Sequence, residues 1–334
     1  MSCPREERER AEHYIIGPYG LLSENSRGRL TPEDECCIRT CFQRDIDRIT
    51  HSKSFRRLKH KTQVFLQPEG DHYRTRLTHT LEVSRLARTV ARALALNEDL
   101  AEAIALGHDL GHTPFGHAGE RALAKIYPGG FKHYEQSLRV VDILERDGRG
   151  LNLCYETRIG ILHHTHGAPD DTPEAVAVRL CDRIAYVNHD LDDSIRAGIL
   201  TDADVPELIR KNCGERNSER INSILTDLIE NSAGGVLKMS DRMQKTFDFF
   251  HVFMYSDVYT NPRAKSEESK VEGILSRLYD YYTAHPDALP EDFRGIIEHE
   301  GTERAATDYI SGMTDGYAME KYGELFIPFA WTVK

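Results

Sequence analysis

The chain is long enough to bury a large core: it has 334 residues, of which 40% are hydrophobic. Its 54 acidic and 43 basic residues give a net charge of −11, which argues against a broad nucleic-acid-binding surface but is compatible with a local cationic pocket. No apolar run approaches the roughly 20 residues of a membrane span. Seven cysteines without a regular framework, and no apolar segment at the N-terminus, predict a reducing, cytoplasmic location.

Taken in chain order, the sequence predicts a mainly helical protein. The first thirty or so residues are charged and then rich in Gly and Ser, which predicts a poorly ordered start unless a partner holds it. Cys36, Cys37 and Cys41 raise the question of a zinc site, but no second ligand pair follows at finger-like spacing, so buried or incidental thiols are the favoured interpretation. Residues 61–76 contain short β-prone runs around a Pro-Glu-Gly-Asp turn and predict a short β-hairpin.

Helical patterns follow the predicted hairpin. Apolar residues recur every three or four positions between 77 and 94, and Asn97 is the expected N-cap of the next helix. Thr172 and Pro173 open a third helix, because proline is preorganised for the first helical position. Near the end, residues 241–259 and 306–326 predict two long amphipathic helices. The polar segment 261–272 between them predicts a mobile loop.

The three helices each direct polar residues inward. The first carries His79 on its apolar face, and the second ends its apolar stripe on His108, which Asp109 follows. Residues Asp182 and Asp190 lie on one stripe of the third helix, two turns apart. Burying two carboxylates beside two imidazoles is costly unless a cation compensates. The pattern therefore predicts a divalent metal site, and a buried salt-bridged cluster is the alternative.

The order H…HD…D resembles the HD superfamily of metal-dependent phosphohydrolases. More narrowly, the chain resembles the deoxyguanosinetriphosphate triphosphohydrolase group of bacterial dNTP triphosphohydrolases. The resemblance runs from about Phe42 to Tyr317, and the segments that carry it are FQRDIDRITHSKSFRRLKHKTQVF, YRTRLTHTLEVSRLARTVARAL, EAIALGHDLGHTPFGHAGE and DYISGMTDGYA. It implies an all-α fold with at most the short hairpin near 61–76. The expected regions are a partly flexible segment over 1–41, an HD catalytic core over 42–200, and a C-terminal helical region over 201–334 that packs on the core and completes a nucleotide pocket.

The resemblance also implies roles for single residues. The metal, expected to be Mg or Mn, would be held by His79, His108, Asp109 and Asp182. The catalytic group would be His112, His117 and Glu120. His117 is the expected general acid, because a departing sugar 5′ oxygen must be protonated and Glu120, one helical turn away, can orient the imidazole. The implied reaction converts a dNTP to the deoxynucleoside and inorganic triphosphate.

Substrate contacts are implied in the same way. Tyr186 and Asp190 would meet the deoxyribose, and a tyrosine under C2′ would exclude ribonucleotides by bulk. Basic residues at 57, 59 and 61 are weaker candidates, because a basic run is more often a solvated face. Asp308, Arg304 and Tyr309 lie in the same helical region near the C-terminus and would close the pocket together. The full set of expected substrate contacts is Gln63, Arg76, His133, Arg183, Tyr186, Asp190, Arg304 and Tyr309.

Two other functional classes stay open. One is a different HD enzyme, such as a 5′-nucleotidase or a (p)ppGpp or cyclic-dinucleotide phosphodiesterase, in which His163, His164 and His166 would hold a second metal. The other is a non-catalytic nucleotide sensor. The base preference is also open. The resemblance implies a homo-oligomer and a nucleotide activator at an oligomer interface, but no motif gives the symmetry or the place of such a site.

Overall fold

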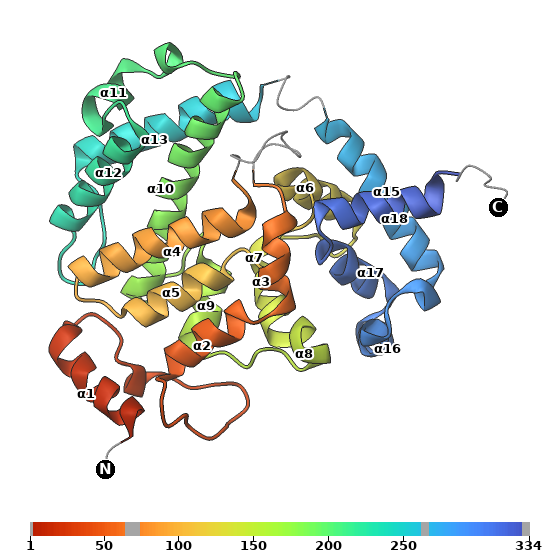
Figure 1. Cartoon of the computed structure of the whole chain (residues 1–334), viewed down its shortest axis with the longest axis horizontal. Coiled ribbons are helices and arrows are strands. Elements are labelled where there is room, and N and C mark those ends of the chain that lie inside the picture. Colours follow the sequence, from red (N-terminus) through yellow and green to blue (C-terminus); the bar gives the residue numbers. More distant parts are fainter. Residues whose placement is uncertain (1–2, 64–73, 262–266, 329–334) are drawn as a thin grey trace, which may run out of the picture.

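A computed structural model describes residues 3–63, 74–261 and 267–328 (Figure 1). Over these ranges the regular elements are helices and strand pairing is limited to isolated bridges, so the predicted all-α fold is confirmed. One bridge joins Thr62 to Thr75 at the base of the predicted hairpin. The turn of that hairpin, at 64–73, lies outside the described residues. No helix within the described ranges combines the length and the apolar character that a bilayer crossing requires.

Three long helices form the centre of the first half of the chain. Helices α4, α5 and α10 pack against one another and bury a continuous apolar cluster that includes Val83, Leu100 and Ile184. Asn97 caps α5 as predicted, because its side chain accepts hydrogen bonds from the backbone N–H groups of the first turn. The helices of this half are α1 (Pro4–Ile15), α2 (Cys41–Thr50), α3 (Lys53–Arg57), α4 (Arg76–Ala93), α5 (Glu98–Gly107), α6 (Gly116–Ile126), α7 (His133–Arg139), α8 (Glu145–Gly148), α9 (Tyr155–His163) and α10 (Pro173–Arg196).

The N-terminal segment, expected to be partly flexible, makes defined contacts. Glu12 of α1 is buried and accepts hydrogen bonds of 2.7 Å from both the backbone N–H and the hydroxyl of Ser23. Farther along, the guanidinium of Arg29 lies 2.5 Å from the fully buried carboxylate of Asp45 on α2. The first contact lies within the segment, and the second ties the segment to the core.

The second half of the chain adds helices on two sides of this core (Figure 1). Helices α11 to α13 extend the first apolar cluster, while α15 to α18 form a separate cluster with α6. A π-helix over Tyr255–Tyr259 continues α13. The α-helices are α11 (Glu207–Cys213), α12 (Asn217–Asn231), α13 (Asp241–Met254), α15 (Glu268–Ala284), α16 (Arg294–Glu300), α17 (Thr302–Ser311) and α18 (Asp315–Phe326).

Two expectations for this half are corrected. The single helix predicted over 306–326 is two helices, because Thr314 caps α18 and its side chain accepts a hydrogen bond from the Tyr317 backbone N–H. The polar segment predicted as a loop over 261–272 is shorter at its C-terminal end, since α15 begins at Glu268. Residues 262–266 lie outside the described residues.

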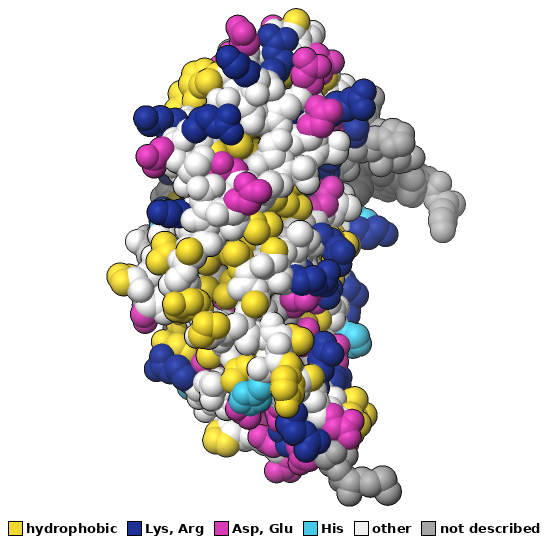
Figure 2. Space-filling view, turned by 90° about the vertical axis from the view of Figure 1, so that its left-hand side faces the viewer, with side chains coloured by type: hydrophobic (Ala, Val, Ile, Leu, Met, Phe, Trp, Pro, Cys, Tyr) yellow, Lys and Arg dark blue, Asp and Glu magenta, His cyan; other side chains and the backbone are white. Residues whose placement is uncertain are grey.

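The molecular surface is mixed. The face in Figure 2 carries a band of hydrophobic side chains between charged ones. Among the exposed hydrophobic residues of the chain are Tyr14 and Ile15 at the end of α1. Tyr19 lies against Gly235 in the segment between α12 and α13, so the N-terminal region borders that segment.

Candidate metal centre and active site

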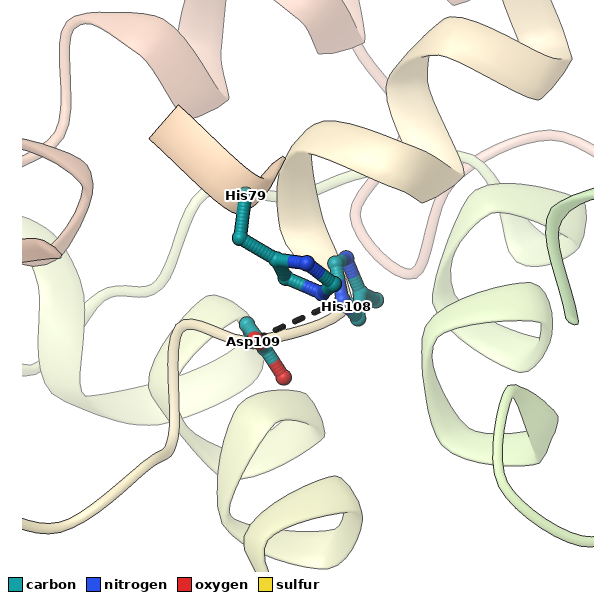
Figure 3. A group of neighbouring side chains, drawn as sticks. All are labelled: His79, His108 and Asp109. Carbon is teal, nitrogen blue, oxygen red and sulfur yellow. Dashed lines mark ion pairs between the residues drawn. The ribbon is translucent and has the colours of Figure 1, made fainter. Parts of the chain in front are cut away.

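Two buried histidines and a buried aspartate from neighbouring elements meet (Figure 3). His79 comes from the first turns of α4, and His108 and Asp109 follow the last residue of α5. One potential ligand atom from each residue lies within 4.8 Å of the other two. Asp182 of α10 faces the same point, with Oδ1 3.0 Å from His79 Nε2 and 3.7 Å from His108 Nε2. The structure therefore brings the four predicted ligands together.

The donor atoms fit a divalent cation. His108 Nδ1 lies 2.6 Å from the Ala105 carbonyl oxygen, which fixes the proton on that nitrogen and leaves Nε2 with a free lone pair. Nε2 is buried and has no hydrogen-bond partner. A buried acceptor without a donor is costly, and a metal bound at this point would satisfy it. Two imidazoles and two carboxylates form a ligand set suited to a transition metal or Mg.

Arg76 balances the negative charge of the cluster. Its Nη1 lies 2.6 Å from Asp109 Oδ2, and both side chains are almost completely buried. Burial opposes ionisation of Asp109, but the neighbouring His108 imidazole and the charge of Arg76 outweigh it and hold the pKa of this carboxyl well below its ordinary value. The pKa of Asp182 is lowered too, since the contacts of its carboxylate with the two histidines outweigh its burial. Both carboxylates are therefore ionised and ready to bind a cation.

The expected catalytic residues lie beside this cluster. His112 Nε2 is 3.2 Å from Asp109 Oδ1, and the His112 ring stacks on His133 with 4.1 Å between centroids. Glu120 joins His117 and His133: its two carboxylate oxygens lie 3.3 Å from His117 Nδ1 and 2.9 Å from His133 Nδ1. These contacts outweigh the burial of Glu120 and lower the pKa of its carboxyl far below the ordinary value. Glu120 is thus a fixed anion between two imidazoles.

The loop over residues 108–115, which carries His112 and leads into α6, is called the catalytic loop and is held by the C-terminal region. Phe115 adopts a left-handed backbone conformation, φ +63°, immediately before α6. Its N–H donates a 2.8 Å hydrogen bond to the buried Asp315 carboxylate, which also accepts hydrogen bonds from the N–H and hydroxyl of Thr62. Asp315 therefore fixes both the catalytic loop and the base of the predicted hairpin.

Tyr186 and Asp190 lie on the same face of α10 as Asp182, as the helical spacing requires. Asp190 is buried, and its Oδ2 accepts a 2.5 Å hydrogen bond from the Tyr259 hydroxyl. Burial raises the pKa of the Asp190 carboxyl well above its ordinary value. The rings of Tyr186 and Tyr259 lie 5.3 Å apart, and that of His117 lies 6.3 Å from Tyr186. Gln63 is also buried, with Oε1 unpartnered.

Three of the expected substrate contacts interact with residues outside the His–Asp cluster. Arg183 is exposed, and its guanidinium stands 5.5 Å from the centre of the Phe247 ring. Arg304 binds Gln136 and the buried Asp308, in a network on the side of α7 and α17. The Tyr309 hydroxyl is 2.9 Å from that of Tyr317. The structure does not bring these three side chains to the His–Asp cluster.

The histidine triplet is divided among different contacts. His163 pairs with Asp171 at 2.6 Å, and the His166 ring meets Tyr134. His164 alone reaches the cluster: its ring is 5.0 Å from that of His108, and its Nε2 is 3.2 Å from His133 Nε2. Over the described ranges, the groups of side chains able to hold a metal contain no cysteine and neither His163 nor His166.

Sequence reasoning missed Tyr259, His164 as a neighbour of His133, and Asp315. Tyr259 lies 69 residues from Asp190, and nothing local to it indicates that contact. The Thr314-Asp315 pair carries a recognisable helix-start pattern, which could have identified the cap.

Known families match this chain in two parts. The HD domain matches residues 76–187, and the phosphohydrolase-associated domain matches residues 237–324. The deoxyguanosinetriphosphate triphosphohydrolase-like protein of Caldanaerobacter subterraneus subsp. tengcongensis is 51% identical, over 98% of this chain and 97% of that protein. That of Desulfatibacillum aliphaticivorans is 47% identical, over 97% and 98%.

The chain belongs to the deoxyguanosinetriphosphate triphosphohydrolase-like family. It is an HD-domain phosphohydrolase, and all four members of the His–Asp cluster fall within the HD match. The second match includes Tyr259, on the wall of the site, and Asp315, behind the catalytic loop. Both matched parts of this HD-domain protein thus contribute to the site.

Proposed function

We propose that this protein hydrolyses deoxynucleoside triphosphates, dGTP or several dNTPs, to the deoxynucleoside and inorganic triphosphate. One observation carries the proposal: the His117–Glu120 pair stands beside a buried His–Asp cluster in a member of the dGTPase-like HD family. The cluster supplies a place for a metal, and the pair supplies a proton donor.

The metal would be held by His79, His108, Asp109 and Asp182, with Mg or Mn as the expected ion. Bound there, it would supply Lewis-acid polarisation of a phosphate oxygen. Water attacks the α-phosphorus, a new P–O bond forms, and the bond from phosphorus to the sugar 5′ oxygen breaks. His117 gives its proton to that departing oxygen, and Glu120 holds the imidazole in place. Triphosphate leaves intact.

The polar stripe of α10 supports a deoxyribose contact. Tyr186 and the buried Asp190 would meet the sugar, and Gln63 has an unpartnered Oε1 with which to accept a hydrogen bond from a hydroxyl. Tyr259 adds an aromatic wall to this side, because its ring lies against that of Tyr186. Arg76 and His133 remain the proposed triphosphate contacts, since a cation and a histidine stand beside the cluster.

The test is to incubate the purified protein with each dNTP and Mg or Mn, alone and in mixtures, and to measure triphosphate. Metal-dependent release of intact triphosphate is expected. His117→Ala should lower kcat about 10²- to 10⁴-fold, the usual contribution of a general acid. The exposed His166→Ala is the control and should retain activity. Release of orthophosphate instead would indicate a nucleotidase, and nucleotide binding without turnover would indicate a sensor.

Assembly and activation are further parts of the proposal. A homo-oligomer with a nucleotide activator at an interface is expected from the family resemblance, and the mixtures test it directly. If one dNTP activates hydrolysis of another, a mixture will be hydrolysed faster than the sum of its components.

A further inference from the structure

A cavity lies between the catalytic loop and the C-terminal helices. It has a volume of about 470 Å³, and its walls come from α3, α8 and the α16–α18 region. Leu110 and Gly111 of the catalytic loop form one wall, and residues 312–314, between α17 and α18, form another. None of the four proposed metal ligands lines this cavity, so it is a separate site.

Two cations converge on this cavity without a carboxylate partner. Lys61 is 3% exposed, and its ammonium donates hydrogen bonds to the carbonyl oxygens of His112 and Ser311. The Arg57 guanidinium lies against Gly312, where a Cβ atom would stand 3.2 Å from Nη1. Among the ion pairs of the described residues, none includes Lys61 or Arg57. An ammonium has three donors, so Lys61 has one to spare.

The electrostatic environment favours an added anion. Burial lowers the pKa of the Lys61 amine to about 7, and the positive charges of Arg57 and Arg76 add to this effect and outweigh the opposing charges of Asp315 and Asp109. A buried ammonium beside a second cation is costly, and a bound anion would remove that cost.

Most of the carboxylates in the lining are already occupied. Glu145 accepts hydrogen bonds from the backbone N–H groups of Lys53 and Ser54 and from the Ser54 hydroxyl. Asp308 is paired with two arginines, Arg139 and Arg304. Asp292 is the remaining acid in the lining and is exposed. Neither Glu145 nor Asp308 is therefore available to neutralise Lys61.

We propose that this cavity binds a doubly charged phosphate-type anion, held by the Lys61 ammonium and the Arg57 guanidinium. Two converging cations suit a dianion better than a single carboxylate, and a guanidinium presents the paired donors that phosphate oxygens accept. Tyr309 and Tyr317 also line the cavity, and because their hydroxyls share one hydrogen bond, one O–H of the pair is left to donate. The bound anion would touch the lysine that holds the His112 carbonyl, and so would contact the support of the catalytic loop. The inference does not depend on the reaction proposed above.

Isothermal titration calorimetry tests the site with inorganic pyrophosphate and the full chain in the presence of EDTA, so that metal-bridged binding is excluded. Arg57→Ala should weaken binding about tenfold or more, the usual worth of a charge-assisted hydrogen bond. Arg56→Ala is the matched control, because Arg56 is the neighbouring residue of α3, donates to the His51 carbonyl and does not line the cavity. Its affinity should match that of the unaltered chain. Equal affinities in all three proteins, or no binding by the unaltered chain, would overturn the proposal.

A thermal assay provides a second measurement. A ligand that binds only the folded chain raises the Tm. Inorganic phosphate should therefore raise the Tm of the unaltered chain and of Arg56→Glu, but not that of Arg57→Glu. A rise of the same size in both variants would contradict the assignment. Neither assay measures nucleotide turnover, so failure here is distinguishable from failure of the proposed reaction.

Discussion

The two sides of the catalytic loop differ in how their polar groups are satisfied. On the side of the His–Asp cluster, His108 Nε2, His112 Nδ1 and Gln63 Oε1 are buried without hydrogen-bond partners. On the opposite side, Asp315 accepts three hydrogen bonds and Asp308 pairs with two arginines. Unmet buried groups are costly and persist where a ligand can satisfy them. The front of the loop thus has several unmet acceptors, while the carboxylates at the back are paired and support the loop, and the spare donor there belongs to Lys61.

Removing the negative charge of Asp109, at the front of the loop, should cause the largest loss in the free energy of unfolding. Asp109→Ala leaves the buried Arg76 guanidinium without its partner, and we expect the free energy of unfolding to fall by about 3–5 kcal/mol. Urea denaturation in EDTA measures this loss without a metal contribution. Adding Arg76→Met to Asp109→Ala should restore part of the stability, because the unpaired charge is gone. A loss below about 1 kcal/mol for the single variant would show that Arg76 does not depend on this pairing.

Helical periodicity in the sequence indicates which residues of the three central helices point inward at the front, while His112, His117, Glu120 and Gln63 are implied by the resemblance. His79 and His108 lie on apolar stripes, and Asp182, Tyr186 and Asp190 recur every four residues, so each helix indicates which of its residues point inward. The structure brings the four predicted ligands together, and the all-α fold is confirmed.

The contacts behind the loop could not be predicted from helical periodicity. Periodicity tells which face of a helix is buried but not which neighbour it meets. The contact of Asp315 with Thr62 spans 253 residues, and α17 and α18 were read as one helix. Arg304 and Tyr309 were assigned to the nucleotide pocket by resemblance alone. In the structure Arg304 pairs with Asp308 and Tyr309 lies against Tyr317, and their contact with a nucleotide stays a prediction.

Close packing between the loop and α7 gives the next prediction. A Cβ atom at Gly111 would clash with the backbone of Gln136 and Ser137, which cannot move as a side chain can. Gly111→Ala should therefore cost about 3 kcal/mol in the free energy of unfolding, the upper end of the range for overpacking. Gly316→Ala on α18 is the matched control, since a Cβ there meets no atom within 4 Å. It should be neutral or stabilising. Similar losses for both variants would refute the packing argument.

Removing a hydrogen bond of Asp315 tests whether this carboxylate holds the catalytic loop in place. Asp315→Asn keeps the shape but replaces one acceptor oxygen by an amide group, so the contact with Thr62 or with Phe115 is lost. We expect a loss of about 2 kcal/mol, the cost of an unsatisfied buried donor. Denaturant unfolding measures it, and Asp241→Asn in the exposed first turn of α13 is the control. If Asp315→Asn unfolds like the control, the carboxylate does not hold the loop.

The smallest change in stability should come from an exposed ion pair behind the loop, in which Glu300 Oε1 lies 2.7 Å from Arg139 Nη2. The hydrogen bond from Arg139 lowers the pKa of the Glu300 carboxyl below 4.5. A carboxyl with a lowered pKa in the folded state stabilises it above the unfolded pKa, and this stabilisation is lost as the pH falls through the folded pKa. Glu300 is more than a third exposed, so solvent screening limits the effect to about 0.5 kcal/mol.

Glu300→Gln should therefore lower the free energy of unfolding slightly and equally at pH 7 and at pH 5.5, with the difference from the unaltered chain shrinking below pH 4.5. Added salt should reduce the difference as well, because exposed charges are screened. Glu298→Gln on the same helix is the control and should show neither dependence. A difference that grew on acidification would reverse the sign of the linkage and exclude the ion pair as its source. Because Arg139 keeps the buried Asp308 as a second partner, losing Glu300 should leave the support behind the loop intact.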